Sequence, residues 1–153
     1  MIKLEKKESI YFLTMDAGEN RWNTTFVREI AKALDTIEDD EGPGALITSA
    51  TDSKFFSNGL DLDWMQAPED YPDGGDREVF GEEFMYLMGR FITLPIPTIC
   101  ALNGHTFGAG FMFALSHDFR IMREDRGFLC ANEMQLGLPV SYTHLTLPTK
   151  VTV

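Results

Sequence analysis

The chain has 153 residues, enough for one domain with a sizeable apolar core, and its 44% apolar and 24% charged residues are ordinary for a soluble globular protein. The formal net charge of −11 and the lack of any run of Lys and Arg argue against a nucleic-acid partner, which would need a clustered basic face. No uninterrupted apolar stretch is long enough to span a bilayer, and the first residues are expected to be neither a secretory signal nor a basic transit peptide.

The first fifty residues predict two strands, a helix and a third strand. Segments 2–5 and 10–15 are apolar or alternate in polarity around a short polar turn, which predicts a β-hairpin. A helix capped by Asn23 or Thr24 is predicted to continue to about residue 38, because apolar residues recur through it at helical spacing. The apolar segment 44–49 then predicts a buried strand.

The middle of the chain predicts a turn, a loop and a second helix. Segment 54–62 follows the strand at 44–49 and ends in small residues before an amphipathic piece. Segment 66–75 is rich in Pro, Asp and Gly and is predicted to be a mobile loop. A helix is predicted over 77–92, with aromatic and aliphatic residues gathered on one side.

A glycine-rich turn follows the predicted strand at 98–102. Gly104, Gly108 and Gly110 remove side chains where a ligand can approach the backbone, and a helix predicted over 108–117 begins inside this turn. The first turn of a helix leaves N–H groups without intrahelical partners, and such donors suit an oxyanion. The alternative is a glycine turn that serves close packing only. This turn and the one near residue 59 are expected to face one site from adjacent layers.

The order and spacing of several motifs resemble the crotonase family, also called the enoyl-CoA hydratase/isomerase superfamily. The resemblance covers residues 1 to about 140 and implies an α/β fold, the ββα spiral, whose successive turns stack short strands into layered sheets. The motifs that carry the resemblance are NRWN at 20–23, FSNGLDL at 56–62, PTICALNGH at 97–105, GAG at 108–110, Asn132-Glu133, and GLP at 137–139.

The same resemblance implies an acyl-CoA site. The backbone N–H groups of Leu60 and Ala109 would form an oxyanion hole for the thioester carbonyl. The substrate would lie beside two turns, which supply the implied binding residues Ser57, Asn58, Gly59, Asp61, Gly108 and Gly110. No metal and no redox cofactor is expected, since CoA arrives as part of the substrate. Its phosphates need a basic neighbour, for which Lys3, Arg21 and Lys54 are unranked candidates.

The acidic residues indicate which reaction is available. Aligned on the glycine run, the first of two glutamates that handle water in the hydratase branch falls on Met112, which cannot exchange a proton. The second falls on Glu133. A single carboxylate beside an enolate-stabilising hole can move a double bond without water, so the chain is similar to the Δ3,Δ2-enoyl-CoA isomerases, most of all their peroxisomal type. The alternative for Glu133 is an idle acid near a helix start.

Histidines and cysteines are given structural roles. His105 is assigned to the end of a strand, and His117 to the end of a helix before Asp118, where a cation is favourable. Cys100 and Cys130 match no metal or redox spacing and are expected to be small apolar core residues.

The chain departs from the family after residue 140. Family members continue with helices that complete the acyl pocket and build a trimer, whereas segment 141–153 is Thr-rich and unlike the family, as in a spliced tail or a sequence-assembly artefact. A partial domain over 1–140 is expected to expose apolar faces. Three functions follow as alternatives: the isomerase in a peroxisome, cytoplasm or mitochondrion; a non-catalytic acyl-CoA binder or inactive truncated chain; and hydration or other thioester chemistry.

Overall fold

Two sheets organise the chain in the computed structural model, which describes residues 1–66 and 74–131. The larger sheet has the strand order β1-β2-β3-β5-β7. β1 pairs antiparallel with β2, and the other neighbours pair in parallel. Its strands are β1 (Ile2–Lys7), β2 (Ile10–Met15), β3 (Ala45–Ala50), β5 (Thr98–Leu102) and β7 (Phe119–Met122).

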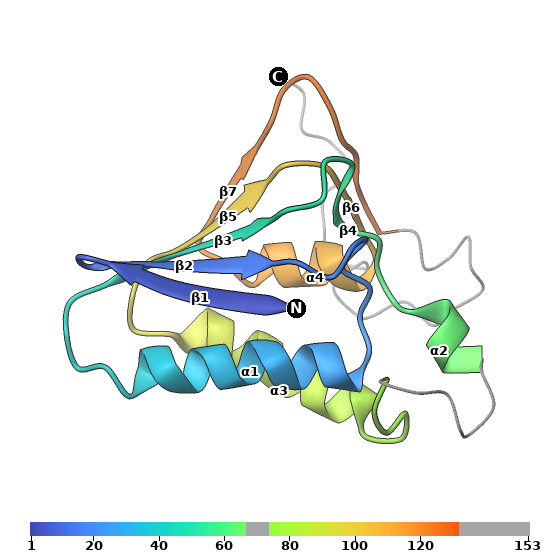
Figure 1. Ribbon diagram of the computed structural model, residues 1–153, viewed down its shortest axis with the longest axis horizontal. Coiled ribbons are helices and arrows are strands. Elements are labelled where there is room, and N and C mark those ends of the chain that lie inside the picture. Colours follow the sequence, from blue (N-terminus) through green and yellow to red (C-terminus); the bar gives the residue numbers. More distant parts are fainter. Residues whose placement is uncertain (67–73, 132–153) are drawn as a thin grey trace.

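The smaller sheet is parallel and has three strands, β4 (Phe55–Ser57), β6 (His105–Phe107) and β8 (Leu129–Cys130), in that order. Each passage of the chain therefore gives one strand to the large sheet and the next strand to the small one, as β3 and β4, β5 and β6, and β7 and β8. Figure 1 shows β4 and β6 beyond the ends of β3 and β5. This repeat of strand, strand and helix confirms the predicted α/β spiral.

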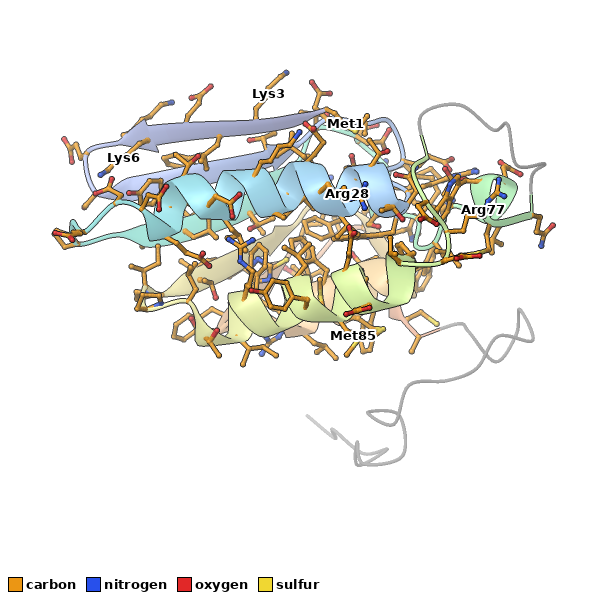
Figure 2. All side chains as sticks on the ribbon, turned by 90° about the horizontal axis from the view of Figure 1, so that it is seen from below. Met1, Lys3, Lys6, Arg28, Arg77 and Met85 are labelled. Carbon is orange, nitrogen blue, oxygen red and sulfur yellow. The ribbon has the colours of Figure 1, made fainter. Side chains whose placement is uncertain are left out.

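Four helices lie within the described residues: α1 (Thr24–Glu38), α2 (Leu62–Gln66), α3 (Phe80–Thr93) and α4 (Ala109–Leu115). α1 begins where predicted, because the Asn23 side chain accepts a hydrogen bond from the Phe26 N–H at 2.9 Å. α1 and α3 run side by side below the large sheet (Figure 1). Arg28 of α1 pairs with Glu83 of α3, and Figure 2 shows these two helices together, with Arg28 and Met85 labelled.

The core lies between the large sheet and these helices. Trp22 is fully buried at its centre, with ring centroids about 5 Å from those of Phe26, Phe84 and Phe113 in edge-to-face arrangements. α1, α3 and α4 thus meet at one side chain. Exposed apolar side chains lie elsewhere, on α3, on β7 and just before β8; they include Ile92, Phe119, Ile121 and Phe128.

The structure corrects several predicted elements. His105 opens β6 instead of ending a strand, and β4 and β7 are additional strands. The helix expected over 108–117 ends at Leu115. Most of the loop predicted at 66–75, and everything after residue 131, lie outside the described residues. Within 1–66 and 74–131, no helix is long and apolar enough to cross a membrane.

Candidate functional site

The two small-residue turns of the sequence follow neighbouring strands of one sheet. β4 leads into the turn at Asn58 to Asp61, and β6 leads into the turn at Gly108, directly before α4. β4 and β6 pair in parallel, so the two turns leave the sheet at the same edge. The turns were expected to face one site from adjacent layers, and the structure instead places them at one edge of a single sheet.

Contacts between the turns are close enough to require glycine. Gly59 has φ +83°, and a Cβ built there would lie 3.0 Å from the Phe107 carbonyl oxygen. Gly108 has φ +48° and forms the N-cap of α4. A Cβ on Gly110 would lie 2.5 Å from the Cβ and Oγ of Ser57. The glycines thus serve close packing, and that packing joins the two turns directly.

The turns leave two backbone donors without a partner. Among residues 1–66 and 74–131, no acceptor takes the N–H of Leu60 or of Ala109. Leu60 directly follows Gly59, and Ala109 directly follows Gly108, so each free N–H adjoins a residue with positive φ. Unpaired N–H groups are costly when they are kept from water, so such a pair suits a ligand oxygen.

Side chains of the first turn mostly hold the turn itself. The Ser57 side chain is fully buried and bonded within the protein, so its hydroxyl faces no ligand. The Asn58 amide donates to Glu19 at 2.8 Å, and this bond lowers the pKa of Glu19 together with a second bond from Arg21. Asp61 accepts the Trp64 N–H at 3.2 Å at the start of α2 and so caps that helix. Figure 2 shows Arg77 beside α2, where its Nε donates to the Trp64 carbonyl.

His117 is a buried neutral residue, so its expected role as a helix-end cation is wrong. It is 3% exposed, and its ring nitrogens contact the Phe113 carbonyl at 2.9 Å and the Thr48 hydroxyl at 2.8 Å. Burial lowers its pKa from 6.5 to about 4. His105 stacks against Phe107 and Phe128, each at a centroid distance of 5.4 Å. Neither ring serves as an exposed base.

Among the described residues, neither the two cysteines nor any cluster of metal-binding side chains forms a second candidate site. Cys100 is buried, and burial raises the pKa of its thiol, whereas Cys130 is only partly buried. No group of three or more His, Cys, Asp or Glu in the part of the chain that the structure describes could hold a metal ion.

The three candidates for a CoA phosphate differ in their partners. Lys3 pairs with Asp16, and Arg21 pairs with both Glu19 and Asp63. Lys54 forms no salt bridge within the described ranges, although its charge adds to the hydrogen bonds that lower the pKa of Glu19 and of Asp52, and its Nζ lies 4.8 Å from the Phe55 ring centroid. Lys54 also directly precedes β4, the strand that leads into the first turn. It is therefore the candidate whose charge remains available.

Two of the hollows on the described part of the surface bear on the location of the site. A polar hollow of about 420 Å³ adjoins the first turn and is lined by Arg21, Asn23, Asp61 and their neighbours. A slightly larger groove of about 450 Å³ runs between α1 and α3, but none of its lining residues belongs to either turn. Because both free N–H groups belong to the turns, the groove between the helices is the weaker candidate for a reaction site.

Of the two positions that align with the hydratase glutamates, one lies within the described residues and the other does not. Met112 lies in α4, partly buried against the core, so the helix after the glycine turn presents a thioether at that position. Glu133 lies outside the described residues, as does segment 141–153. The roles of Asn20 and Trp22, which contact β4 ahead of the first turn, could not be predicted from the sequence because their hydrogen bonds leave no periodic pattern.

This α/β spiral, with two turns converging at one sheet edge, is matched by proteins of one family. Residues 5–152 match the model of the enoyl-CoA hydratase/isomerase family, a range that includes most of segment 141–153. Enoyl-CoA delta isomerase 2, peroxisomal, of Arabidopsis thaliana is 36% identical over 140 residues, which cover 90% of this chain and 58% of that protein. Enoyl-CoA delta isomerase 3 of the same plant is 36% identical over 92% of this chain and 59% of its own length.

A solved structure has a similar fold. The crotonase described as an enoyl-CoA hydratase/isomerase from Legionella pneumophila superposes with a TM-score of 0.76 at 26% identity, over 90% of this chain and 52% of that one. The chain belongs to the enoyl-CoA hydratase/isomerase, or crotonase, family. It spans less than two thirds of the length of each of these relatives.

Proposed function

We propose that the chain carries the chemistry of an enoyl-CoA isomerase, which converts a 3-enoyl-CoA into a 2-enoyl-CoA during fatty-acid β-oxidation. The observation that carries the proposal is the pair of unpartnered N–H groups, of Leu60 and Ala109, on two turns in contact. The names of the Arabidopsis relatives support the reaction type. The name of Arabidopsis isomerase 2 also supports a peroxisomal location, and we extend the proposal to a trimer for the whole protein.

The reaction needs a base, an acid and a place for negative charge. Removal of a proton from the carbon between the thioester carbonyl and the double bond gives a dienolate, whose charge gathers on the thioester oxygen. Hydrogen bonds from Leu60 and Ala109 would stabilise that oxygen more strongly than they stabilise the neutral carbonyl. We assign the proton to Glu133, which would return it to the far carbon of the original double bond.

Binding of the substrate is assigned to the same turns. We assign binding to Gly59, Gly108 and Gly110, of which Gly59 and Gly110 pack the two turns together, and to Asn58 and Asp61 in the first turn. Lys54, with its charge available, is the candidate for a CoA phosphate. No metal or redox group is needed for any of these steps.

Met112 argues against hydration. Addition of water to a 2-enoyl-CoA is expected to need a second proton-exchanging group after the glycine turn, and the Met112 thioether, in the first turns of α4, cannot exchange protons. One carboxylate suffices for isomerisation, because the proton removed is the proton returned.

Two substrates and two glutamine variants test the proposal. The purified chain is expected to convert a 3-enoyl-CoA to its 2-enoyl isomer and to leave a 2-enoyl-CoA unhydrated. Glu133→Gln should lower this rate by about 10²- to 10⁴-fold, because the amide cannot carry the proton. Glu124→Gln, at an exposed acid between β7 and β8, is the matched control and should keep the rate.

Two results would reject the isomerase. Hydration of the 2-enoyl-CoA without isomerisation would point to hydratase chemistry. Tight acyl-CoA binding by calorimetry with no turnover of either substrate, unchanged in Glu133→Gln, would make the chain a non-catalytic acyl-CoA binder.

A further inference from the structure

We infer that residues 19–22 form a positioning clamp that aims the Leu60 N–H, with Trp22 and Ser57 as the positioning residues of the site. The inference rests on the proposed function, because it assigns to these residues the geometry of the oxyanion donors. None of them is proposed to touch the substrate.

Backbone hydrogen bonds fix the first turn on both sides of Leu60. The Asn58 N–H donates to the Glu19 carbonyl at 2.9 Å, and the Trp22 N–H donates to the Gly59 carbonyl at 2.8 Å. The Asp61 N–H returns to the Trp22 carbonyl at 2.9 Å, and Leu60 pairs with Trp22 as an isolated parallel bridge. The peptide groups before and after Leu60 are therefore held by the clamp, which leaves the Leu60 N–H itself unpaired.

The Ser57 hydroxyl is the centre of the side-chain contacts. It accepts the Trp22 indole N–H at 3.0 Å and donates to the Asn20 carbonyl at 2.8 Å. It also accepts a longer bond of 3.3 Å from the Gly59 N–H. One donor and two acceptor positions are thus all used, so the hydroxyl has no freedom to rotate.

Asn20 supports the same turn from the clamp. It is fully buried with φ +49°, an uncommon conformation for a residue other than glycine. Its side-chain amide donates to the Phe56 carbonyl at 3.0 Å, and its side-chain oxygen accepts the Ala17 N–H at 2.9 Å. The clamp therefore holds β4 as well as the turn that follows it.

Ser57 also sets the distance between the two donors. A Cβ on Gly110 would lie 2.5 Å from Ser57, so the first turn of α4 rests directly on this side chain. A shift of Ser57 would move the Leu60 turn relative to the Ala109 turn. Since the indole ring of Trp22 is already fixed by three aromatic neighbours, its N–H provides a rigid reference for Ser57.

A misplaced donor should weaken stabilisation of charge more than binding of the neutral ligand. Oxyanion stabilisation depends on donors placed in advance at short distance from the charged oxygen, whereas most affinity for an acyl-CoA comes from contacts remote from it. Loss of the Trp22 N–H should therefore change the acidity of a bound ligand and leave its affinity nearly unchanged. Substitution of a residue with only a packing role would not change the acidity of the bound ligand without also changing its affinity.

Acetoacetyl-CoA provides the readout, because its enolate absorbs in the near ultraviolet. Its apparent pKa when bound is measured by absorbance titration, beside the affinity for a butyl-CoA thioether, which lacks the carbonyl oxygen. Trp22→Phe keeps the ring and removes the N–H. The matched control is Trp64→Phe, at the chain's other tryptophan, which is also buried and donates to the Gly75 carbonyl at 3.1 Å.

We expect Trp22→Phe to lower the acid dissociation constant of bound acetoacetyl-CoA by about tenfold, less than the 10²- to 10³-fold cost of removing a donor outright. Thioether affinity should change less than twofold, and Trp64→Phe should leave both quantities at the wild-type value. Ser57→Ala should reproduce the Trp22→Phe effect, and the double variant should add little to it, because both act through one hydrogen bond. Ser57→Ala alone decides the matter if Trp22→Phe does not fold.

Failure of the inference is distinct from failure of the proposed function. If the wild-type chain lowers the pKa of bound acetoacetyl-CoA but neither Trp22→Phe nor Ser57→Ala alters it, the clamp is structural only and the inference is wrong. If the wild-type chain binds acetoacetyl-CoA without lowering its pKa, the oxyanion hole itself is absent and the proposed function fails with it.

Discussion

At the scale of single residues, the site depends on glycines, whose missing Cβ lets other elements pack against the backbone. Gly110 lies in α4, where alanine would be the better helix former, yet Ser57 occupies the space that a Cβ would need. Gly89 lies in α3, and no other element comes within 4 Å of the place that a Cβ would take there. Gly110 and Gly89 thus differ in whether another element rests on them.

Alanine substitutions at these positions should have opposite effects on stability. Gly110→Ala forces Ser57 and α4 apart and should lower the free energy of unfolding by about 1–3 kcal/mol. Gly89→Ala should raise it by about 0.5–1 kcal/mol, because only the helix propensity changes. Urea unfolding measures both, and equal effects of the same sign would show that the contact between Gly110 and Ser57 does not restrain the turns.

At the scale of elements, α4 is tied to the large sheet through the residues that directly follow it, His117 and Asp118. His117 bonds the Thr48 hydroxyl of β3, and Asp118 accepts both the N–H and the hydroxyl of Thr98 at the start of β5. The Thr98 bonds lower the pKa of Asp118. These bonds hold the carboxyl end of α4, while its first turn carries the Ala109 N–H.

His117 should make this attachment sensitive to acid. Its pKa is about 4 in the folded chain and near 6.5 when unfolded, so between these values the unfolded chain binds the extra proton. The free energy of unfolding should therefore fall by about 3 kcal/mol as the pH drops from 6.5 through 4, with the loss from this group complete about one pH unit below 4. Carboxylates with lowered pKa, such as Asp118, contribute mainly at the acid end of this range.

Urea unfolding at several pH values checks this effect against a His117→Gln variant. The glutamine has no titrating ring, so the variant should be less stable at neutral pH but lose much less stability between about pH 6.5 and 4.5. A variant with the wild-type slope over that interval would show that His117 is not the group responsible.

Elements with a repeated pattern could be predicted from the sequence, and very short ones could not. α1 and β5 lie where their apolar periodicity and flanking residues indicate. β4 and β6 have three residues each, too few to show an alternation, and they exist because they pair with each other. The same reason explains the error at His105, which opens a strand that only tertiary pairing defines.

The two glycine turns of the candidate site could be predicted from the sequence, whereas the residues that hold these turns in place could not. Glycines near residues 59 and 108 indicated where the chain could approach a ligand, and the structure brings those turns together. The bonds of Trp22 and Asn20 to the first turn join segments more than thirty residues apart, and no local pattern encodes them. His117 was misjudged because sequence position suggests a helix end but does not reveal burial.

At the scale of the whole molecule, the donors come from segments about fifty residues apart that only the spiral brings together. Successive passages place β4 and β6 next to each other, and α4 then begins against the turn after β4. The chain has a net charge of −11, which repels a ligand that carries phosphates. The positive charge of Lys54, next to β4, would attract such a ligand locally. The fold thus supplies the pair of N–H groups, and the surrounding residues hold them in place.

A crystal structure of the chain with a bound saturated acyl-CoA, which cannot react, tests the account most directly. We predict that the thioester oxygen lies about 2.7–3.1 Å from the backbone nitrogens of both Leu60 and Ala109. A thioester oxygen bound away from these turns, or within reach of only one of the two nitrogens, would contradict the account.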